Sequence, residues 1–263
     1  MHHAFGYITL LASLLCFGCG SAGTPSTDGV PLDSTAVQGP TPPEQLVNSL
    51  VGKWMSQEYC DCLTRQRSAF DCRSMADDIY VMYVERTGSD SLRWSYITTH
   101  EGGPEVMLAY DPHVQGFVGQ PGEYSTEEVI QVRSVDKDLL ELRTVRQGPP
   151  RRFVRVESEQ ELLLGALFSG VFVDEGTGDT VRFRPNGQVT GLPGIDQAIV
   201  LTDFTEGLDD RDIVFLYTGQ YDWDKDSYHY AYNGQQLLLY PMLATEEEYV
   251  YRMGDVRFHL RKL

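Results

Sequence analysis

The sequence predicts an all-β fold of two tandem antiparallel up-and-down β-barrels, preceded by a signal peptide and a disordered linker. Three observations lead to this prediction. Short segments rich in β-branched and aromatic residues follow one another along most of the chain. Breakers such as Gly88-Ser89-Asp90 separate these segments, and helical periodicity is nearly absent. The two halves of this region also open alike, with a glycine two residues before an aromatic side chain.

The N-terminus predicts export. Residues 5–17 form a short apolar run, FGYITLLASLLCF. A bilayer-spanning helix needs about 20 apolar residues, so this run predicts a secretory signal peptide over residues 1–18. The Gly18-Cys19 pair that follows resembles the lipobox of bacterial lipoproteins, which implies acylation of Cys19. Phe17 and Cys16 depart from that pattern, since the family prefers Leu and a small residue two and three places before the Cys. The alternatives are a secreted soluble protein and a different start codon.

Residues 19–44 predict a flexible tether. After Cys19 the segment reads GSAGTPSTDGVPLDSTAVQGPTPPE, with no aromatic and no basic residue. Such a composition cannot bury enough apolar area to offset the entropy of ordering, so it should stay extended. Together with Cys19 it predicts a lipid-anchored protein of the bacterial cell envelope, held at the membrane through its N-terminal acyl chains only.

The first half, residues 45–158, predicts a meander of short strands. A short helical segment at 43–50 leads into the first strand, and the best helix candidate spans 63–76. The further strands are predicted at 79–86, 92–99, 105–110, 127–135, 139–145 and 151–156.

The second half, residues 159–263, repeats this style after a helical turn at 159–166. Its strands are predicted at 169–174, 179–185, 188–191, 197–204, 212–218, 227–232, 236–241, 247–253 and 256–263. Asn186-Gly187 and Asn233-Gly234 predict type I′ hairpin turns. So many antiparallel strands must hide their edges, and closure into barrels does so completely. The alternative is one larger sandwich or barrel that uses all the strands.

The openings of the two halves carry a family resemblance. Gly52-Lys53-Trp54 and Gly170-Val171-Phe172 each follow an apolar lead-in. This pattern resembles the first-strand signature of the lipocalin (calycin) superfamily, in which the aromatic side chain plugs one end of an eight-stranded barrel. The second opening departs from it by having Phe for Trp, and both halves are shorter than a typical secreted lipocalin.

The lipocalin resemblance also implies a basic residue over each plug. In the family an Arg from the last strand packs on the plug aromatic. Arg152 or Arg155 would do so for Trp54, and Arg257 or Arg261 for Phe172.

The cysteines predict one disulfide. With Cys16 in the signal peptide and Cys19 acylated, Cys60, Cys62 and Cys72 remain. In an oxidising compartment we expect Cys60 or Cys62 to bridge to Cys72. A metal site built on Cys-x-Cys would need a fourth ligand and suits reducing compartments better, so no metal and no cofactor are expected.

Charge and motifs exclude several function classes. The chain has 21 Lys and Arg against 38 Asp and Glu, a net charge of −17, so a nucleic-acid partner has no electrostatic basis. His100-Glu101 at a strand end is the one pair suited to acid–base chemistry, and a polar turn explains it more simply. Asp222 to Asp226 alternates carboxylates without the glycine and glutamate that an EF-hand requires, which leaves a solvated loop or a looser calcium site. We therefore expect no enzyme.

The tyrosines give the leading function hypothesis. Strand alternation places Tyr228, Tyr230 and Tyr232 on one face, where they would line a small-molecule pocket, fill a core or form an outer aromatic patch. The leading hypothesis is an envelope lipoprotein that binds or carries a small hydrophobic or amphiphilic ligand in a barrel. The alternative is a non-catalytic structural or protein-interaction module of the envelope. A hydrolase or isomerase that uses His100 and Glu101 comes third.

Overall fold

The computed structural model describes residues 42–75, 79–97, 103, 105–119, 130–144, 149–203, 211–220, 222–247 and 250–263. The predicted signal peptide (1–18), Cys19 and the tether as far as residue 41 lie outside the described residues, as do His100 and Glu101. The described part confirms the predicted fold class, because its strands form two antiparallel barrels. The single larger barrel is therefore wrong.

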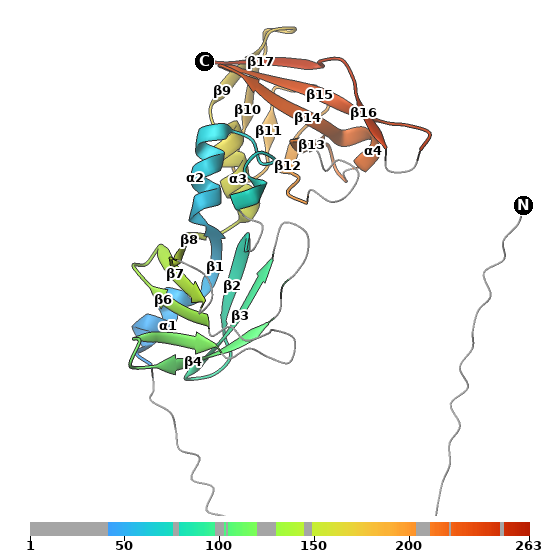
Figure 1. Ribbon diagram of the computed structural model, residues 1–263. Helices are drawn as coiled ribbons and strands as arrows, with labels where there is room; N and C mark the ends of the chain where they lie inside the picture. The colour runs from blue at the N-terminus through green and yellow to red at the C-terminus, as the bar shows by residue number, and fades with distance from the viewer. Residues whose placement is uncertain are drawn as a thin grey trace, which may run out of the picture. The chain divides into compact units, whose positions relative to one another are not determined.

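The first barrel is closed and up-and-down, since each strand pairs with its sequence neighbours and β8 returns to β1. It appears in blue to yellow-green in Figure 1. Its described strands are β1 (Gly52–Ser56), β2 (Val81–Arg86), β3 (Ser91–Ile97), β4 (Val106–Asp111), β5 (Gly116–Gly119), β6 (Ile130–Ser134), β7 (Leu139–Thr144) and β8 (Arg151–Val156).

The second barrel, yellow to red in Figure 1, is nearly closed. The last strand, β17, pairs with β9, and a single bridge between Gln188 and Gln197 joins β11 to β12. The short β16 lies off this path and pairs with the end of β15. The strands are β9 (Val171–Asp174), β10 (Thr180–Phe183), β11 (Val189–Thr190), β12 (Gln197–Val200), β13 (Ile213–Tyr217), β14 (Ser227–Asn233), β15 (Gln236–Ala244), β16 (Tyr251–Met253) and β17 (Phe258–Lys262).

The described helices are short. They are α1 (Glu44–Leu50), α2 (Gln57–Gln66), the 3-10 turn η1 (Arg73–Met75), α3 (Glu159–Phe168) and α4 (Trp223–Asp226). The helix expected at 63–76 is wrong in its bounds, because α2 already begins after Ser56, whose side chain accepts the Tyr59 N–H. It ends at Arg67, which adopts a left-handed conformation with φ 54°.

The two Asn-Gly turns are not type I′. That type needs a positive φ at both central residues, and here only Gly187 (φ 88°) and Gly234 (φ 61°) have one. At the first turn, the Asn186 side chain instead accepts the Gln188 N–H at 3.2 Å, and the Gly187 N–H donates to the Arg184 carbonyl at 3.0 Å. Asn186 therefore stabilises the turn through its side-chain hydrogen bond, without adopting a positive φ.

Each barrel interior is filled by alternating side chains. In β4, for example, Val106 and Leu108 are buried whereas Met107 is 56% exposed. The first barrel encloses a cluster that includes Trp54, Met82, Trp94, Phe117 and Phe153, each at most 2% exposed. The second encloses Phe168, Phe172, Phe183, Tyr230 and Leu239, among others.

The core of the second barrel extends into the segment that follows β1. Tyr59, Leu63, Ala69 and Tyr80 belong to the same buried cluster as the interior of the second barrel. In Figure 1, α2 lies beside α3, which leads into β9. The insertion between β1 and β2 therefore packs against the second barrel as well as the first.

Candidate functional site

The three tyrosines of β14 line the interior of the second barrel. Tyr230 is fully buried, Tyr228 is nearly so, and Tyr232 is half-buried at the end of the strand. The Tyr230 ring packs edge-on against Phe168, with 5.0 Å between ring centroids. Protein atoms therefore already occupy the space against Tyr228 and Tyr230, and of the three tyrosines Tyr232 is the one that lines a pocket.

A docking loop, defined here as residues 67–72, joins the two barrels. The Ala69 N–H donates to the Tyr230 hydroxyl at 3.2 Å, and the Phe70 N–H donates to Asp212 Oδ1 at 2.8 Å. A disulfide between Cys62 and Cys72 closes this segment, which selects Cys62 of the two predicted partners. The loop is thus fixed covalently at its base and by hydrogen bonds at its tip.

Asp212 accepts a hydrogen bond from the docking loop, and its surroundings disfavour ionisation of its carboxyl. Burial raises the pKa of its carboxyl, the repulsion from Asp71 adds to this rise, and hydrogen bonds from Phe70, Ser68 and Tyr230 partly offset it. The carboxyl is therefore held by donors from both barrels. Its backbone carbonyl lies 2.9 Å from His229 Nδ1.

A second polar contact joins the barrels at Glu159, the first residue of α3. Its Oε1 accepts the Tyr80 hydroxyl at 2.7 Å and the Thr202 hydroxyl at 3.3 Å, and its Oε2 lies 3.9 Å from Lys53 Nζ. Burial raises the pKa of Tyr80 well above the ordinary value, so this phenol stays protonated and donates. The arrangement links strands of both barrels and presents no nucleophile beside a base.

Tyr59 lies next to this contact. Its ring stands perpendicular to that of Tyr80, with 5.1 Å between the centroids. The side chain is fully buried, and its hydroxyl has no hydrogen-bond partner among the residues that the structure describes.

In each barrel a basic residue of the last strand lies opposite the aromatic residue that opens the first strand. Arg155 lies opposite Trp54 in the β1–β8 register, with its guanidinium 4.3 Å from the indole centroid. Its side chain also donates to the carbonyls of Ser49 and Val51 at 2.7 Å each. A Cβ on Gly52 would lie 2.4 Å from Arg155 Nη1, so the glycine makes room for the arginine.

The same arrangement recurs in the second barrel with a lysine. Lys262 lies opposite Phe172 in the β9–β17 register, and a Cβ on Gly170 would lie 2.6 Å from Lys262 Cε. The arginines expected over Phe172 lie elsewhere: Arg257 stacks on Phe258 and Arg261 pairs with Glu175. That expectation is wrong because the register places Lys262, one residue beyond Arg261, opposite the plug.

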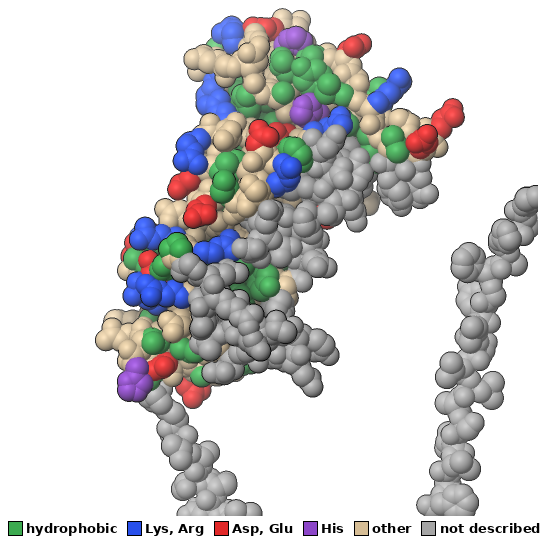
Figure 2. Space-filling model, viewed as in Figure 1, with side chains coloured by type: hydrophobic (Ala, Val, Ile, Leu, Met, Phe, Trp, Pro, Cys, Tyr) green, Lys and Arg blue, Asp and Glu red, His purple; other side chains and the backbone are tan. Residues whose placement is uncertain are grey.

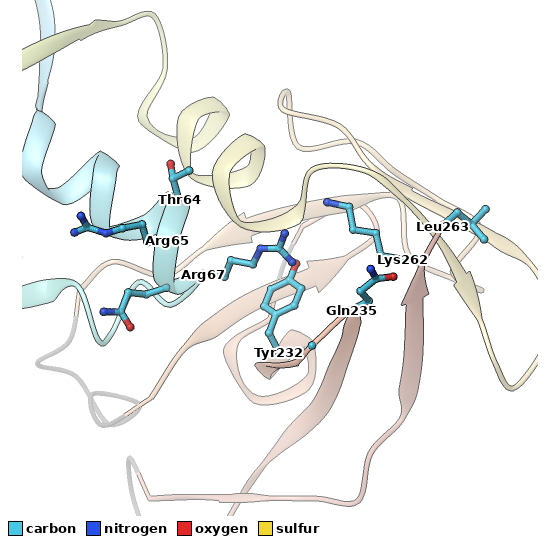
Figure 3. A pocket seen from close by; sticks show the side chains of 9 residues that line it. Thr64, Arg65, Arg67, Tyr232, Gln235, Lys262 and Leu263 are labelled. Carbon is cyan, nitrogen blue, oxygen red and sulfur yellow. The ribbon is translucent and has the colours of Figure 1, made fainter.

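The candidate site is a pocket of about 630 Å³ beside this plug, between α2 and the end of the second barrel. Figure 3 shows it from close by. It is lined by Thr64, Arg65, Gln66, Arg67, Tyr232, Gly234, Gln235, Lys262 and Leu263. Polar and basic side chains dominate this wall, so it differs from the apolar barrel interior that the leading sequence hypothesis expects.

One of the pocket's cations, Arg67, is positioned by its neighbours. Arg67 lies over the Tyr232 ring, 4.9 Å from its centroid, and the Tyr232 hydroxyl donates to the Leu167 carbonyl. Burial raises the pKa of Tyr232, so its hydroxyl keeps the proton that it donates. In Figure 3 the side chains of Arg67 and Lys262 extend toward one another, whereas Arg65 points away from them.

Sequence reasoning missed this pocket. Arg67 and Lys262 lie at opposite ends of the folded chain in sequence, and neither belongs to a motif. The one available signal was the segment between Cys62 and Cys72, which carries Arg65 and Arg67 in a strongly acidic protein.

The remaining candidate residues form no second site in the described part of the chain. Asp222 pairs with Lys225 at 2.6 Å, and its N–H donates to Asp226 Oδ2, so these carboxylates bind their own loop. Cys60 is half-buried, and burial raises the pKa of its thiol to about 12. Among the described residues, no group of three or more His, Cys, Asp or Glu is arranged to hold a metal ion.

A smaller pocket of about 210 Å³ lies on the outer wall of the first barrel, over β5, β6 and β7. Glu141, at 5% exposure, lies there between Arg133 and Arg152, and these arginines lower the pKa of its carboxyl. The arrangement is a local ion network.

No helix in the described residues is long and apolar enough to cross a membrane. Comparisons of the chain with protein-family models, with curated proteins and with solved structures give no match.

Proposed function

We propose that this protein is a non-catalytic structural and interaction module of the bacterial cell envelope, built from two lipocalin-like barrels with filled interiors. In this proposal the outer surfaces and the barrel ends make contacts, and the barrel interiors carry no cargo. The partner would be another envelope component.

The filling of both interiors is the observation that carries the proposal. A cargo barrel needs an interior cavity of about 300 Å³ or more. The first barrel instead encloses two tryptophans and two phenylalanines at no more than 2% exposure, and the second is filled by Phe168, Phe172 and Tyr230. Both pockets described above lie outside the barrel interiors.

The repeated plug supports the lipocalin-like assignment. In each barrel a glycine with positive φ, Gly52 or Gly170, precedes a buried aromatic residue by two positions. In each, a cation from the last strand crosses the space above that glycine. Both barrels thus use the same arrangement, as expected of a duplicated unit.

Native mass spectrometry tests the absence of cargo. The full chain is exported to an oxidising compartment, purified, and measured before and after incubation with membrane lipid extract. The proposal predicts the mass of the polypeptide, with acyl chains only if they are attached. An added mass that is lost on denaturation, lost in Tyr230→Ala and kept in His229→Ala, its neighbour on the other face of β14, would show cargo in the second barrel and refute the proposal.

The anchor is part of the same proposal and has its own test. Acylation at Cys19 predicts that radiolabelled palmitate is incorporated into the exported chain and that Cys19→Ala abolishes this. The variant should then partition into the aqueous phase, because acyl chains are the only proposed membrane attachment. Equal labelling of the wild type and the variant would contradict the assignment.

A further inference from the structure

The pocket between α2 and the second barrel has an unusual charge for this protein. The chain carries a net charge of −17, and Figure 2 shows acidic side chains interspersed with basic ones on the face in view. The pocket wall, in contrast, includes Arg65, Arg67 and Lys262 and no Asp or Glu side chain. Within the described ranges, none of these three cations forms an ion pair.

The backbone at Arg67 supports a role for its side chain. The residue ends α2 in the left-handed region, with φ 54°, where glycine or asparagine is the favoured residue. Its side chain is nevertheless held over Tyr232, and Tyr232 is itself fixed by its hydrogen bond to Leu167. Arg67 is therefore presented to the pocket from a rigid support, so that little side-chain entropy remains to be lost on binding.

Lys262 reaches the same place from the other wall. It crosses the space left by Gly170, and in Figure 3 it extends toward Arg67, with Gln235 close by. Two like charges that extend toward one another repel, and an anion between them would convert this repulsion into attraction.

We propose that this pocket binds the carboxylate or phosphate group of a small polar molecule, with Arg67 and Lys262 as the charged ligands. The planar guanidinium accommodates two oxygens of such a group and the ammonium a third. The Gln235 amide supplies a neutral donor on the same wall. A volume of about 630 Å³ exceeds that of a bare oxyanion, so the pocket has room for further atoms beyond the anionic group.

The competing explanation is that these cations only stabilise the C-terminal ends of the helices electrostatically. Helix α2 ends at this pocket, and the Leu167 carbonyl near the end of α3 accepts the hydroxyl of Tyr232 from the pocket wall. The carbonyl end of a helix attracts positive charge. That explanation requires no ligand and predicts that added anions leave the protein unaffected. The two explanations therefore differ in a direct binding measurement.

Isothermal titration calorimetry measures the binding. The full exported chain is used at low ionic strength, in a buffer that contains neither phosphate nor citrate. The probes are inorganic phosphate and citrate, which distinguish a phosphate site from a carboxylate site. We expect one-site binding of at least one probe that weakens as salt is added. Lys262→Met and Arg67→Gln should each weaken it by about tenfold or more.

A matched control removes the same charge outside the pocket. Arg261 lies next to Lys262 on β17, is not among the residues that line the pocket, and pairs with Glu175. Arg261→Gln should therefore bind within about twofold of the wild type. Lys262→Met keeps the apolar stem over Gly170, and near-ultraviolet circular dichroism checks that it folds.

The proposal is overturned if neither probe binds, or if all three variants weaken binding equally, since the second result would reflect only the overall charge. It does not depend on empty barrel interiors. Cargo in a barrel would refute the function proposed above and leave this site intact, and loss of this site would leave that function intact.

Discussion

At the residue scale, each barrel opens with a glycine because a basic side chain of the last strand leaves no room for a Cβ at that position. At Gly52, φ is +146° and an added Cβ would lie 2.4 Å from Arg155 Nη1. Arg155 closes the barrel by covering Trp54 and by donating to carbonyls that precede β1. One small residue thus allows the contact between the first and last strands.

Gly52→Ala should therefore lower the free energy of unfolding by about 2–4 kcal/mol, through backbone strain and displacement of the arginine. Gly165→Ala is the matched control, since Gly165 lies within α3 with nothing within 4 Å of its added Cβ. It should stabilise the protein by about 0.5–1 kcal/mol, because alanine is the better helix former. Urea denaturation measures both, and equal effects of the two substitutions would contradict the assignment.

Arg67 allows stability to be separated from binding. Arg67→Gly relieves the left-handed strain, worth about 1 kcal/mol, and loses a stacking contact of about 0.5–1 kcal/mol, so the free energy of unfolding should change by less than about 1 kcal/mol. The same variant should lose the binding of phosphate or citrate. Arg65→Gly, within the helix, should instead cost about 1 kcal/mol. A large loss of stability in Arg67→Gly would show that the arginine is structural.

At the element scale, the insertion between β1 and β2 depends on the Cys62–Cys72 disulfide. The bond closes a short loop that includes the residues that contact Tyr230 and Asp212. Loss of such a loop closure costs on the order of 3 kcal/mol in the chain-entropy model.

The double variant Cys62→Ala, Cys72→Ala should therefore unfold at lower guanidinium concentration, with a loss on the order of 3 kcal/mol. Cys60→Ala is the control, since this thiol forms no disulfide, and it should change stability by less than about 1 kcal/mol. If the double variant were as stable as the control, the disulfide would not hold the docking loop.

Most strands could be predicted from the sequence, and the exceptions have physical causes. The alternation of apolar and polar side chains in segments such as 105–110 depends only on the local sequence, and β4 shows the corresponding alternation of buried and exposed residues. The short strand β5 lies between glycines and offers only two large side chains, too few to show a period. The start of α2 was missed because its capping residue, Ser56, also belongs to β1.

The candidate site could not be predicted in the same way. Its two principal side chains, Arg67 and Lys262, meet only because the insertion of the first half packs on the end of the second barrel. Nothing in the local sequence encodes that contact. The tyrosine pattern was visible, but alternation specifies only that the residues share a face, and the packing of Phe168 against Tyr230 decides that this face is core.

At the scale of the whole molecule, the two barrels are joined by the half-buried carboxyl of Asp212. Asp212 accepts the Phe70 N–H from the docking loop, and burial raises the pKa of its carboxyl. A carboxyl whose pKa is higher in the folded state favours folding most at low pH, and this contribution is lost as the pH rises above the ordinary value near 3.8 and through the raised folded pKa.

Asp212→Asn keeps the oxygen that accepts the Phe70 N–H and removes the charge. Across this pH range, the free energy of unfolding of the variant should therefore rise relative to the wild type as the pH increases. Urea denaturation at a series of pH values measures this difference. A difference that does not change with pH, or that changes in the opposite direction, would show that burial does not oppose ionisation of Asp212.

Coupling of the two barrels through the insertion is the central claim, and unfolding followed by two probes tests it most directly. In a Trp223→Phe background the remaining tryptophans, Trp54 and Trp94, both report on the first barrel, whereas far-ultraviolet circular dichroism reports on both barrels. If the insertion makes the barrels one cooperative unit, the two curves coincide at a single midpoint in urea. A circular dichroism curve with two steps, only one of which matches the fluorescence, would contradict that coupling.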